Sequence, residues 1–159
     1  MSEGGGRMGW KQVVQNAPDE GEILVVEDER PVREALTKLV TRFGYQVRSA
    51  ASAEEGDNWL ASQTFDLVLL DIELPKMKGV EFLRWVLDRS PETAVIMMTG
   101  LDDPKLAIEC LQNGARTYLV KPPDPEFLRL AIRDALAVRR ILMERNDLRE
   151  DSASSLPSL

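Results

Sequence analysis

Short apolar runs separated by stretches of helical spacing constrain this chain more than any other feature of its sequence. The clearest runs lie at residues 23–26, 67–70, 95–98 and 118–120. Continuous apolar runs of this length are typical of strands buried on both faces of a parallel sheet, and helices usually connect such strands. The spacing therefore predicts an α/β fold built on a doubly wound parallel sheet.

The segments between these runs supply the rest of the predicted fold. Strands are predicted at residues 22–27, 45–49, 66–71, 93–98 and 116–120, and helices at about 31–44, 52–60, 80–89, 104–113 and 124–149. Five βα units with right-handed crossovers favour a flavodoxin-like (βα)5 sheet with the strand order 2-1-3-4-5. The apolar stripe that should pack on the sheet ends near Val138, whereas the predicted helix continues to about residue 149. We therefore expect an extended C-terminal helix that projects from the domain.

The chain divides into a leader, a domain and an extension. Residues 1–20 are rich in glycine and show no sustained hydrophobic period, which predicts a flexible leader. Residues 21–138 are enough to bury a core and form the domain. Residues 139–159 are predicted to form a helical extension and a disordered tail. Whether the extension is a dimer interface, a linker helix or a frayed end stays open, because fewer than two heptads do not define a coiled coil.

Composition narrows the possible functions. The net charge of −7 argues against direct nucleic acid binding. The absence of histidine excludes histidine-based acid/base catalysis, imidazole zinc sites and a phosphohistidine formed on this chain. The single cysteine, Cys110, cannot form an internal disulfide, and no apolar run approaches the roughly 20 residues that cross a bilayer. We therefore expect a cytoplasmic protein without membrane contact.

Four of the strands end in residues that suit phosphoryl chemistry. The first runs into Glu27 and Asp28, the third stops at Asp71, the fourth stops at Thr99 and the fifth stops at Lys121. In an open parallel sheet, ligands bind outside the carboxyl ends of the strands. These side chains are therefore expected to meet at one edge of the sheet.

The chemistry of such a cluster follows from its charges. Clustered carboxylates repel one another, so Glu27, Asp28 and Asp71 require a cation or raised pKa values. Hard oxygen ligands with open positions suit Mg²⁺, which commonly binds one or two carboxylates and a phosphate oxygen. With Mg²⁺ bound, Asp71 can attack phosphorus to form an aspartyl phosphate, while Lys121 and Thr99 contact the phosphoryl oxygens.

Four segments carry a family resemblance. They are residues 23–29, 69–75, 98–100 and 118–122, which read ILVVEDE, LLDIELP, MTG and YLVKP. In their order and spacing over about residues 21–135, they resemble the receiver domain of bacterial two-component response regulators. An acidic pair after a strand is common by itself, whereas four motifs in register at four strand ends are highly specific.

The resemblance implies a role for each matching residue. Asp71 would be the phosphoacceptor. Mg²⁺ would be held by Glu27, by Asp28 and Asp71, and by the backbone carbonyl of Glu73. Thr99 would be the switch hydroxyl.

The fifth strand supplies the remaining matches. Lys121 would be the phosphate-binding cation, and Tyr118 would move inward when Thr99 moves toward the phosphate. The peptide bond between Lys121 and Pro122 would be cis. Glu73 occupies a position that tunes the phosphate lifetime in this family, but the sequence does not give the direction of its effect.

The resemblance also implies a function and partners. A sensor histidine kinase or a phosphotransfer protein would donate the phosphoryl group, and the chain would catalyse only its own phosphorylation and dephosphorylation. The face of the fourth helix, fifth strand and last helix would then change its affinity for a downstream protein target. A homodimer through this face, or through the C-terminal helix, is a further expectation.

Three alternatives remain from the sequence. A Mg²⁺-dependent phosphatase or mutase would need an aspartate two residues after Asp71, where Glu73 stands, and a cap domain for which no segment is left. A phosphorylation-independent receiver-like scaffold usually lacks one of the site residues, all of which are present here. The chain is alternatively the receiver fragment of a longer multidomain signalling protein.

Overall fold

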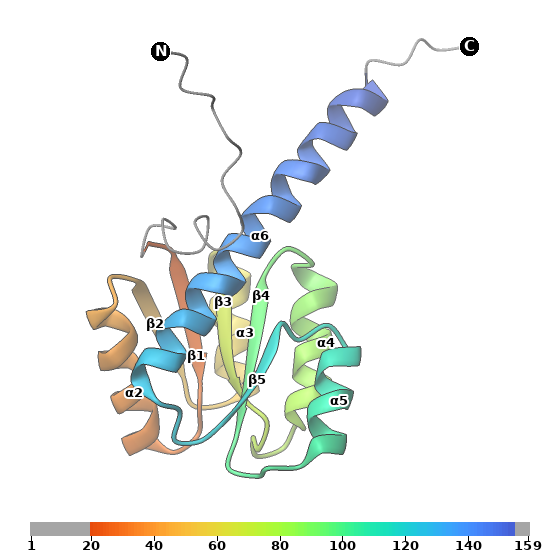
Figure 1. Cartoon of the computed structure of the whole chain (residues 1–159). Coiled ribbons are helices and arrows are strands. Elements are labelled where there is room, and N and C mark those ends of the chain that lie inside the picture. Colours follow the sequence, from red (N-terminus) through yellow and green to blue (C-terminus); the bar gives the residue numbers. More distant parts are fainter. Residues whose placement is uncertain (1–19, 155–159) are drawn as a thin grey trace.

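The computed structural model describes residues 20–154 and contains a five-stranded parallel sheet with helices on both faces (Figure 1). In chain order the elements are β1 Glu22–Val26, α2 Arg30–Arg42, β2 Gln46–Ala50, α3 Ala53–Ser62, β3 Leu67–Asp71, α4 Gly79–Arg89, β4 Ala94–Thr99, α5 Pro104–Gln112, β5 Thr117–Val120 and α6 Pro125–Ser154. The sheet has the order β2-β1-β3-β4-β5, which confirms the predicted fold class.

Local signals placed most helix ends correctly. Ser52 caps α3 by accepting a hydrogen bond from the Glu55 backbone at 3.2 Å. Asp103 caps α5, and Gly44 follows α2 with a positive φ of 109° that favours glycine. The last helix is the exception, because α6 continues to Ser154 instead of ending near Arg149. No glycine or proline interrupts residues 139–154, and most of them are good helix formers.

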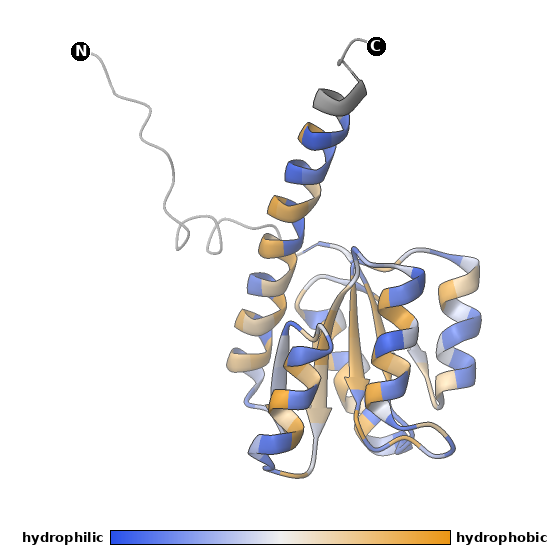
Figure 2. Cartoon of the chain, turned by 90° about the vertical axis from the view of Figure 1, so that its right-hand side faces the viewer, coloured by the Kyte–Doolittle hydropathy of each residue, from blue (hydrophilic) through white to orange (hydrophobic). Residues whose placement is uncertain are grey.

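The sheet buries apolar side chains on both faces. On one face α2 and α6 cover alternate strand residues such as Ile23 and Val25, whereas α3, α4 and α5 cover the other face, which includes Leu24 and Val26. Figure 2 shows the hydrophobic residues gathered on the strands and on the helix sides turned toward them. Two covered faces explain why β3 and β4 are buried along their whole length.

The last helix leaves the body of the domain at Arg139. Its guanidinium lies 3.1 Å from the Asp66 carboxylate and donates to the Glu92 carbonyl at 2.9 Å, so it contacts the segments that precede β3 and β4. Beyond it α6 projects past the edge at which the strands begin (Figure 1). Ile141 and Leu148 are 51% and 68% exposed there. Among residues 20–154, no helix is long and apolar enough to span a membrane.

The ends of the chain bear on the predicted domain division. The predicted leader, apart from Glu20, lies outside the described residues, as do residues 155–159. The boundaries at residues 20 and 138 therefore stay predictions.

The loop between β3 and α4 closes tightly on its own start. The Gly79 amide donates to the Ile72 carbonyl at 3.0 Å. A Cβ atom at Gly79 would lie 2.4 Å from the Ile72 Cα atom and 2.9 Å from the Asp71 carbonyl oxygen. Because these neighbours are backbone atoms, they cannot rotate away, and only glycine fits.

We expect Gly79→Ala to lower the free energy of unfolding by about 1–3 kcal/mol, because the added methyl group must displace backbone at the end of β3. Urea denaturation measures this loss. Gly100→Ala is the matched control, since a Cβ atom there meets no heavy atom within 4 Å. Equal stability losses in the two variants would contradict the close approach at Gly79.

Candidate functional site

Two neighbouring strands bring the acidic residues together. Val26, the last residue of β1, pairs with Leu70 of β3, so Glu27 and Asp28 follow one strand where Asp71 ends the other. A carboxylate oxygen from each of the three residues lies within 4.8 Å of the other two. The convergence expected from the sequence is therefore confirmed for this acidic cluster.

Lys121 reaches the acidic cluster from the end of β5. Its Nζ atom lies 2.5 Å from Glu27 Oε2 and 3.2 Å from Asp71 Oδ1. The Lys121 amide donates to the Thr99 carbonyl at 2.7 Å, which continues the ladder between β4 and β5, and its bond to Pro122 is cis as expected. The sequence suggested proximity to Asp71 but did not indicate that Glu27 is the nearer partner.

Burial and charge act together on the ion pair. Glu27 is fully buried, and this desolvation raises its pKa, with repulsion from Asp71 adding to the effect and the Lys121 hydrogen bond opposing it. Burial alone would lower the pKa of Lys121, but the bond to Glu27 and the charges of Asp71 and Glu27 outweigh it and raise that pKa. One ammonium thus faces three carboxylates, which leaves the cluster electrostatically suited to a cation.

Asp71 is itself held by the loop that follows it. It is 2% exposed, and its Oδ1 atom accepts a hydrogen bond from the Glu73 amide at 3.0 Å as well as the contact with Lys121. The amide of Ile72, the residue directly after Asp71, donates to the Met98 carbonyl on β4 at 2.9 Å. These bonds fix the direction of the carboxylate at the carboxyl edge of the sheet.

A chain of hydrogen bonds runs from Glu73 to Tyr118. The buried Thr99 hydroxyl donates to Glu73 Oε1 at 3.3 Å and accepts from the Leu101 amide at 3.1 Å. The Tyr118 hydroxyl donates to the Leu101 carbonyl at 2.8 Å, and partial burial raises the Tyr118 pKa. Thr99 and Tyr118 are thus connected through Leu101. The sequence pointed to both residues and to an effect of Glu73 on the phosphate lifetime, but not to the contact between the Glu73 side chain and Thr99.

The acidic pair has a further support that sequence reasoning missed. Arg33, on the first turn of α2, donates to the carbonyls of Glu27 and Asp28 at 3.0 and 3.2 Å. The Glu29 amide also donates to Glu27 Oε1 at 3.3 Å. These contacts hold the backbone of the pair, whereas the Asp28 side chain stays exposed. The only signal in the sequence was a basic residue one turn into the following helix.

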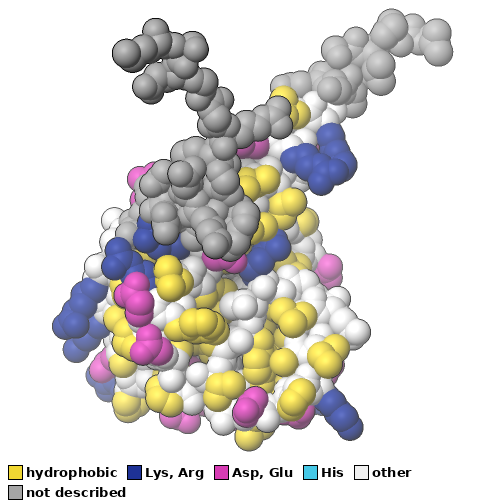
Figure 3. Space-filling model, in the orientation of Figure 1, with side chains coloured by type: hydrophobic (Ala, Val, Ile, Leu, Met, Phe, Trp, Pro, Cys, Tyr) yellow, Lys and Arg dark blue, Asp and Glu magenta, His cyan; other side chains and the backbone are white. Residues whose placement is uncertain are grey.

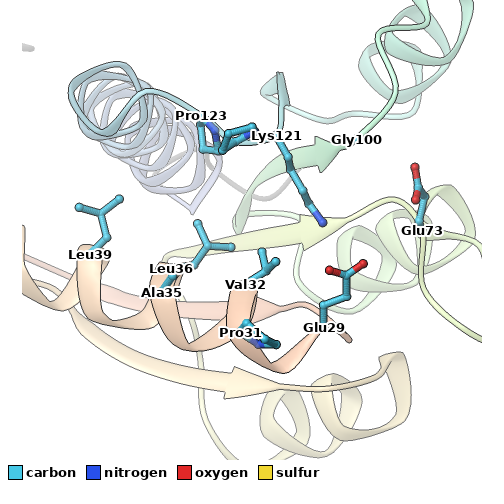
Figure 4. A pocket seen from close by; sticks show the side chains of 11 residues that line it. Glu29, Pro31, Val32, Ala35, Leu36, Leu39, Glu73, Gly100, Lys121 and Pro123 are labelled. Carbon is cyan, nitrogen blue, oxygen red and sulfur yellow. The ribbon is translucent and has the colours of Figure 1, made fainter.

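A cleft of about 560 Å³ opens beside the cluster, between α2 and the segment that follows β5. Lys121 points into it, and Glu29 and Glu73 lie at its rim (Figure 4). The opposite wall is apolar and comes largely from α2, including Val32 and Leu36. A charged reaction partner can therefore approach the acidic cluster along an apolar surface.

The donor set fits a hard divalent cation. Carboxylate oxygens are the ligands of Mg²⁺, Ca²⁺ and Mn²⁺ alike, so the cluster of Glu27, Asp28 and Asp71 is consistent with a metal site without selecting Mg²⁺. Glu73 lies in the adjacent loop, and the role of its carbonyl as a ligand stays a prediction.

Comparison with known proteins identifies the relatives of this chain. Residues 23–133 match the family model of the response regulator receiver domain. The chain is 34% identical over 123 residues to the alginate biosynthesis transcriptional regulatory protein AlgB of Pseudomonas syringae pv. tomato. This matching region covers 77% of this chain and 28% of that protein. The matching region spans between 26% and 33% of the length of eight such curated relatives.

Solved structures give the same result. A CheY-like response regulator receiver domain protein from Methanospirillum hungatei JF-1 is 32% identical, with a TM-score of 0.71, covering 75% of this chain and 95% of that one. The BeF3-activated DrrB receiver domain is 28% identical, with a TM-score of 0.67, covering 74% of this chain and 97% of that one.

We expect Asp71→Asn to stabilise the metal-free protein by about 1 kcal/mol at pH 7, because it removes one of three clustered charges and keeps an oxygen that accepts from Glu73 and Lys121. Urea denaturation in a chelator measures the gain. Added Mg²⁺ should stabilise the unmodified protein more than the variant. Asp88→Asn, at an exposed position, is the control for loss of one charge. Destabilisation of metal-free Asp71→Asn would contradict the electrostatic account.

Proposed function

Because the chain belongs to the response regulator receiver domain family, we propose that it is a Mg²⁺-dependent switch that accepts a phosphoryl group on Asp71. The observation that carries this proposal is the position of Asp71, which lies in the acidic cluster and 3.2 Å from the Lys121 ammonium. A carboxylate with this surrounding charge is suited to attack phosphorus and to tolerate the added negative charge.

The proposed donor is a phosphohistidine on a sensor histidine kinase or phosphotransfer protein. An Asp71 carboxylate oxygen forms a bond to phosphorus as the bond from phosphorus to the histidine nitrogen breaks, and the histidine keeps that electron pair. Glu27, Asp28, Asp71 and the Glu73 carbonyl are the residues that would hold Mg²⁺. When bound, the ion neutralises the developing charge on the phosphoryl oxygens.

Lys121 and Thr99 would contact the phosphoryl group and change their own contacts when it is present. Lys121 exchanges part of its pairing with Glu27 for a phosphoryl oxygen, and the Thr99 hydroxyl donates to another. Because Leu101 bonds to both Thr99 and Tyr118, movement of Thr99 changes the support of the Tyr118 ring. The charge of the phosphoryl group thereby shifts Thr99 and Tyr118 from one arrangement toward another.

The response surface that we propose consists of α5, β5 and α6. Exposed apolar side chains gather on these elements and on the loop before α5, and Figure 3 shows such residues over this side of the molecule. They are Leu101, Ile108, Leu111, Val120, Phe127 and Leu130. Exposed apolar surface of this extent suits a downstream protein or a second copy of the chain.

We also propose limits to the activity of the chain. Its chemistry is limited to its own phosphorylation and dephosphorylation, in the cytoplasm and without direct nucleic acid or membrane binding. Membership of the receiver family removes the support for a phosphatase or mutase. Because the matching regions are only 28% and 33% of two curated relatives, we favour a receiver that acts on an output carried by a further domain or a separate protein.

Incubation with acetyl phosphate and Mg²⁺ should add one phosphoryl group to the chain, because a small acyl phosphate supplies the same electrophile as the kinase. Intact mass spectrometry detects the adduct. We expect none with Asp71→Asn or in a chelator, and an ordinary yield with Asp88→Asn.

Rapid turnover is separated from a lack of reaction by beryllofluoride, which binds an aspartate as a phosphoryl mimic. If neither an adduct nor a beryllofluoride complex formed, the phosphorylation-independent scaffold would replace the switch.

Beryllofluoride should increase self-association through the α5, β5 and α6 surface, since this surface adjoins Leu101, which bonds to both Thr99 and Tyr118. Sedimentation velocity measures the change. Ile108→Glu on α5 should abolish it, whereas Leu148→Glu on the projecting part of α6 should not. The reverse pattern would assign the interface to the C-terminal helix, and no association of the unmodified chain would leave the surface to a different protein.

A further inference from the structure

The side chain of Glu73 makes a contact that the proposed phosphoryl chemistry does not require. Glu73 lies in the exposed loop after β3, yet its Oε1 atom reaches the hydroxyl of Thr99, which is fully buried at the end of β4. The same residue donates its amide to Asp71. Glu73 therefore connects Asp71 at the end of β3 to Thr99 at the end of β4 before any phosphoryl group is present.

The hydrogen-bonding capacity of Thr99 makes this contact a competition. A hydroxyl carries one proton to donate, and Thr99 donates it to Glu73 while accepting from the Leu101 amide. A phosphoryl group on Asp71 requires the same proton, because its oxygens only accept. Thr99 cannot donate to the phosphoryl group until it has left the Glu73 carboxylate.

Charge favours the same exchange. Glu73 lies at the rim of the cleft into which Lys121 points (Figure 4), whereas the ammonium itself pairs with Glu27 and Asp71. The Glu73 carboxylate therefore repels a phosphoryl dianion on Asp71. After phosphorylation, the Glu73 carboxylate and the phosphoryl group would compete for the Thr99 hydroxyl and repel each other. Displacement of the Glu73 carboxylate ends the competition and reduces the repulsion.

From this geometry we propose that Glu73 is a positioning residue that holds Thr99 in its unphosphorylated arrangement, so that phosphorylation acts by displacing the Glu73 carboxylate from the Thr99 hydroxyl. The inference rests on the proposed function and adds its resting-state restraint. Release of Thr99 also breaks the hydrogen bond from the Leu101 amide to the Thr99 hydroxyl. Because the Leu101 carbonyl accepts from the Tyr118 hydroxyl, a movement of Leu101 also affects Tyr118. Glu73 thus sets how readily the switch responds.

Two substitutions separate the hydrogen bond from the charge. Glu73→Gln removes the charge but keeps an oxygen that accepts from Thr99, whereas Glu73→Ala removes both. Beryllofluoride affinity, measured with Mg²⁺ by fluorine NMR titration, should rise in both variants. We expect Glu73→Ala to bind about fivefold more tightly than Glu73→Gln, the effect of one ordinary hydrogen bond.

The Thr99→Ala background tests the origin of that difference. Without the hydroxyl there is nothing for residue 73 to hold, so Glu73→Ala and Glu73→Gln should bind beryllofluoride equally in that background. Glu144→Gln, on the projecting part of α6, is the control for the loss of one charge and should not change the affinity. If the two Glu73 variants differ equally with and without Thr99, or do not differ with Thr99 present, the restraint is overturned.

A second measurement does not depend on phosphorylation. In metal-free protein the NMR resonance of the Thr99 methyl group should move in Glu73→Ala and stay near its original position in Glu73→Gln. Failure of the unmodified chain to bind beryllofluoride would overturn the proposed function, whereas an unmoved Thr99 resonance in Glu73→Ala would overturn only the restraint.

Discussion

The structure depends on the placement of three carboxylates and one ammonium at the carboxyl edge of a parallel sheet. Burial of Glu27 is unfavourable for a charged group, and the chain tolerates it because Lys121 crosses from β5 to pair with it. The same pairing leaves the acidic cluster with more negative than positive charge. This balance is consistent with a metal site, and in the proposed function the Lys121 ammonium is already positioned for an incoming phosphoryl group.

The fold supplies the precision that this balance requires. β1 and β3 are neighbours, which sets the acidic pair beside Asp71, and β4 and β5 bring Thr99 and Lys121 to the same edge. The strands themselves are buried on both faces, so their ends have little freedom to shift. Asp71 and Thr99 are themselves the last residues of β3 and β4, and the loops that follow them can change conformation without disturbing the core.

The acidic cluster and the projecting part of α6 lie at opposite edges of the sheet. The site lies at the carboxyl edge of the strands, whereas α6 leaves the domain at the opposite edge, where Arg139 attaches it to Asp66 and to the segment before β4. The exposed apolar residues of α5, β5 and α6 lie between these ends. In the proposed function, this surface responds to a change of charge at Asp71.

The sequence by itself determined the buried parallel strands and the residues that follow them, because burial on both faces imposes continuous apolar runs. The succession of five βα units favoured the strand order that the structure has. The sequence also predicted that Asp71, Thr99 and Lys121 would lie where neighbouring strands end, and the structure places them there, whereas their roles stay predictions. Only the tertiary structure decided that Lys121 lies nearer to Glu27 than to Asp71, and that the Glu73 side chain holds Thr99. Those contacts join distant segments whose side-chain directions depend on loop geometry, and no local period or spacing encodes them.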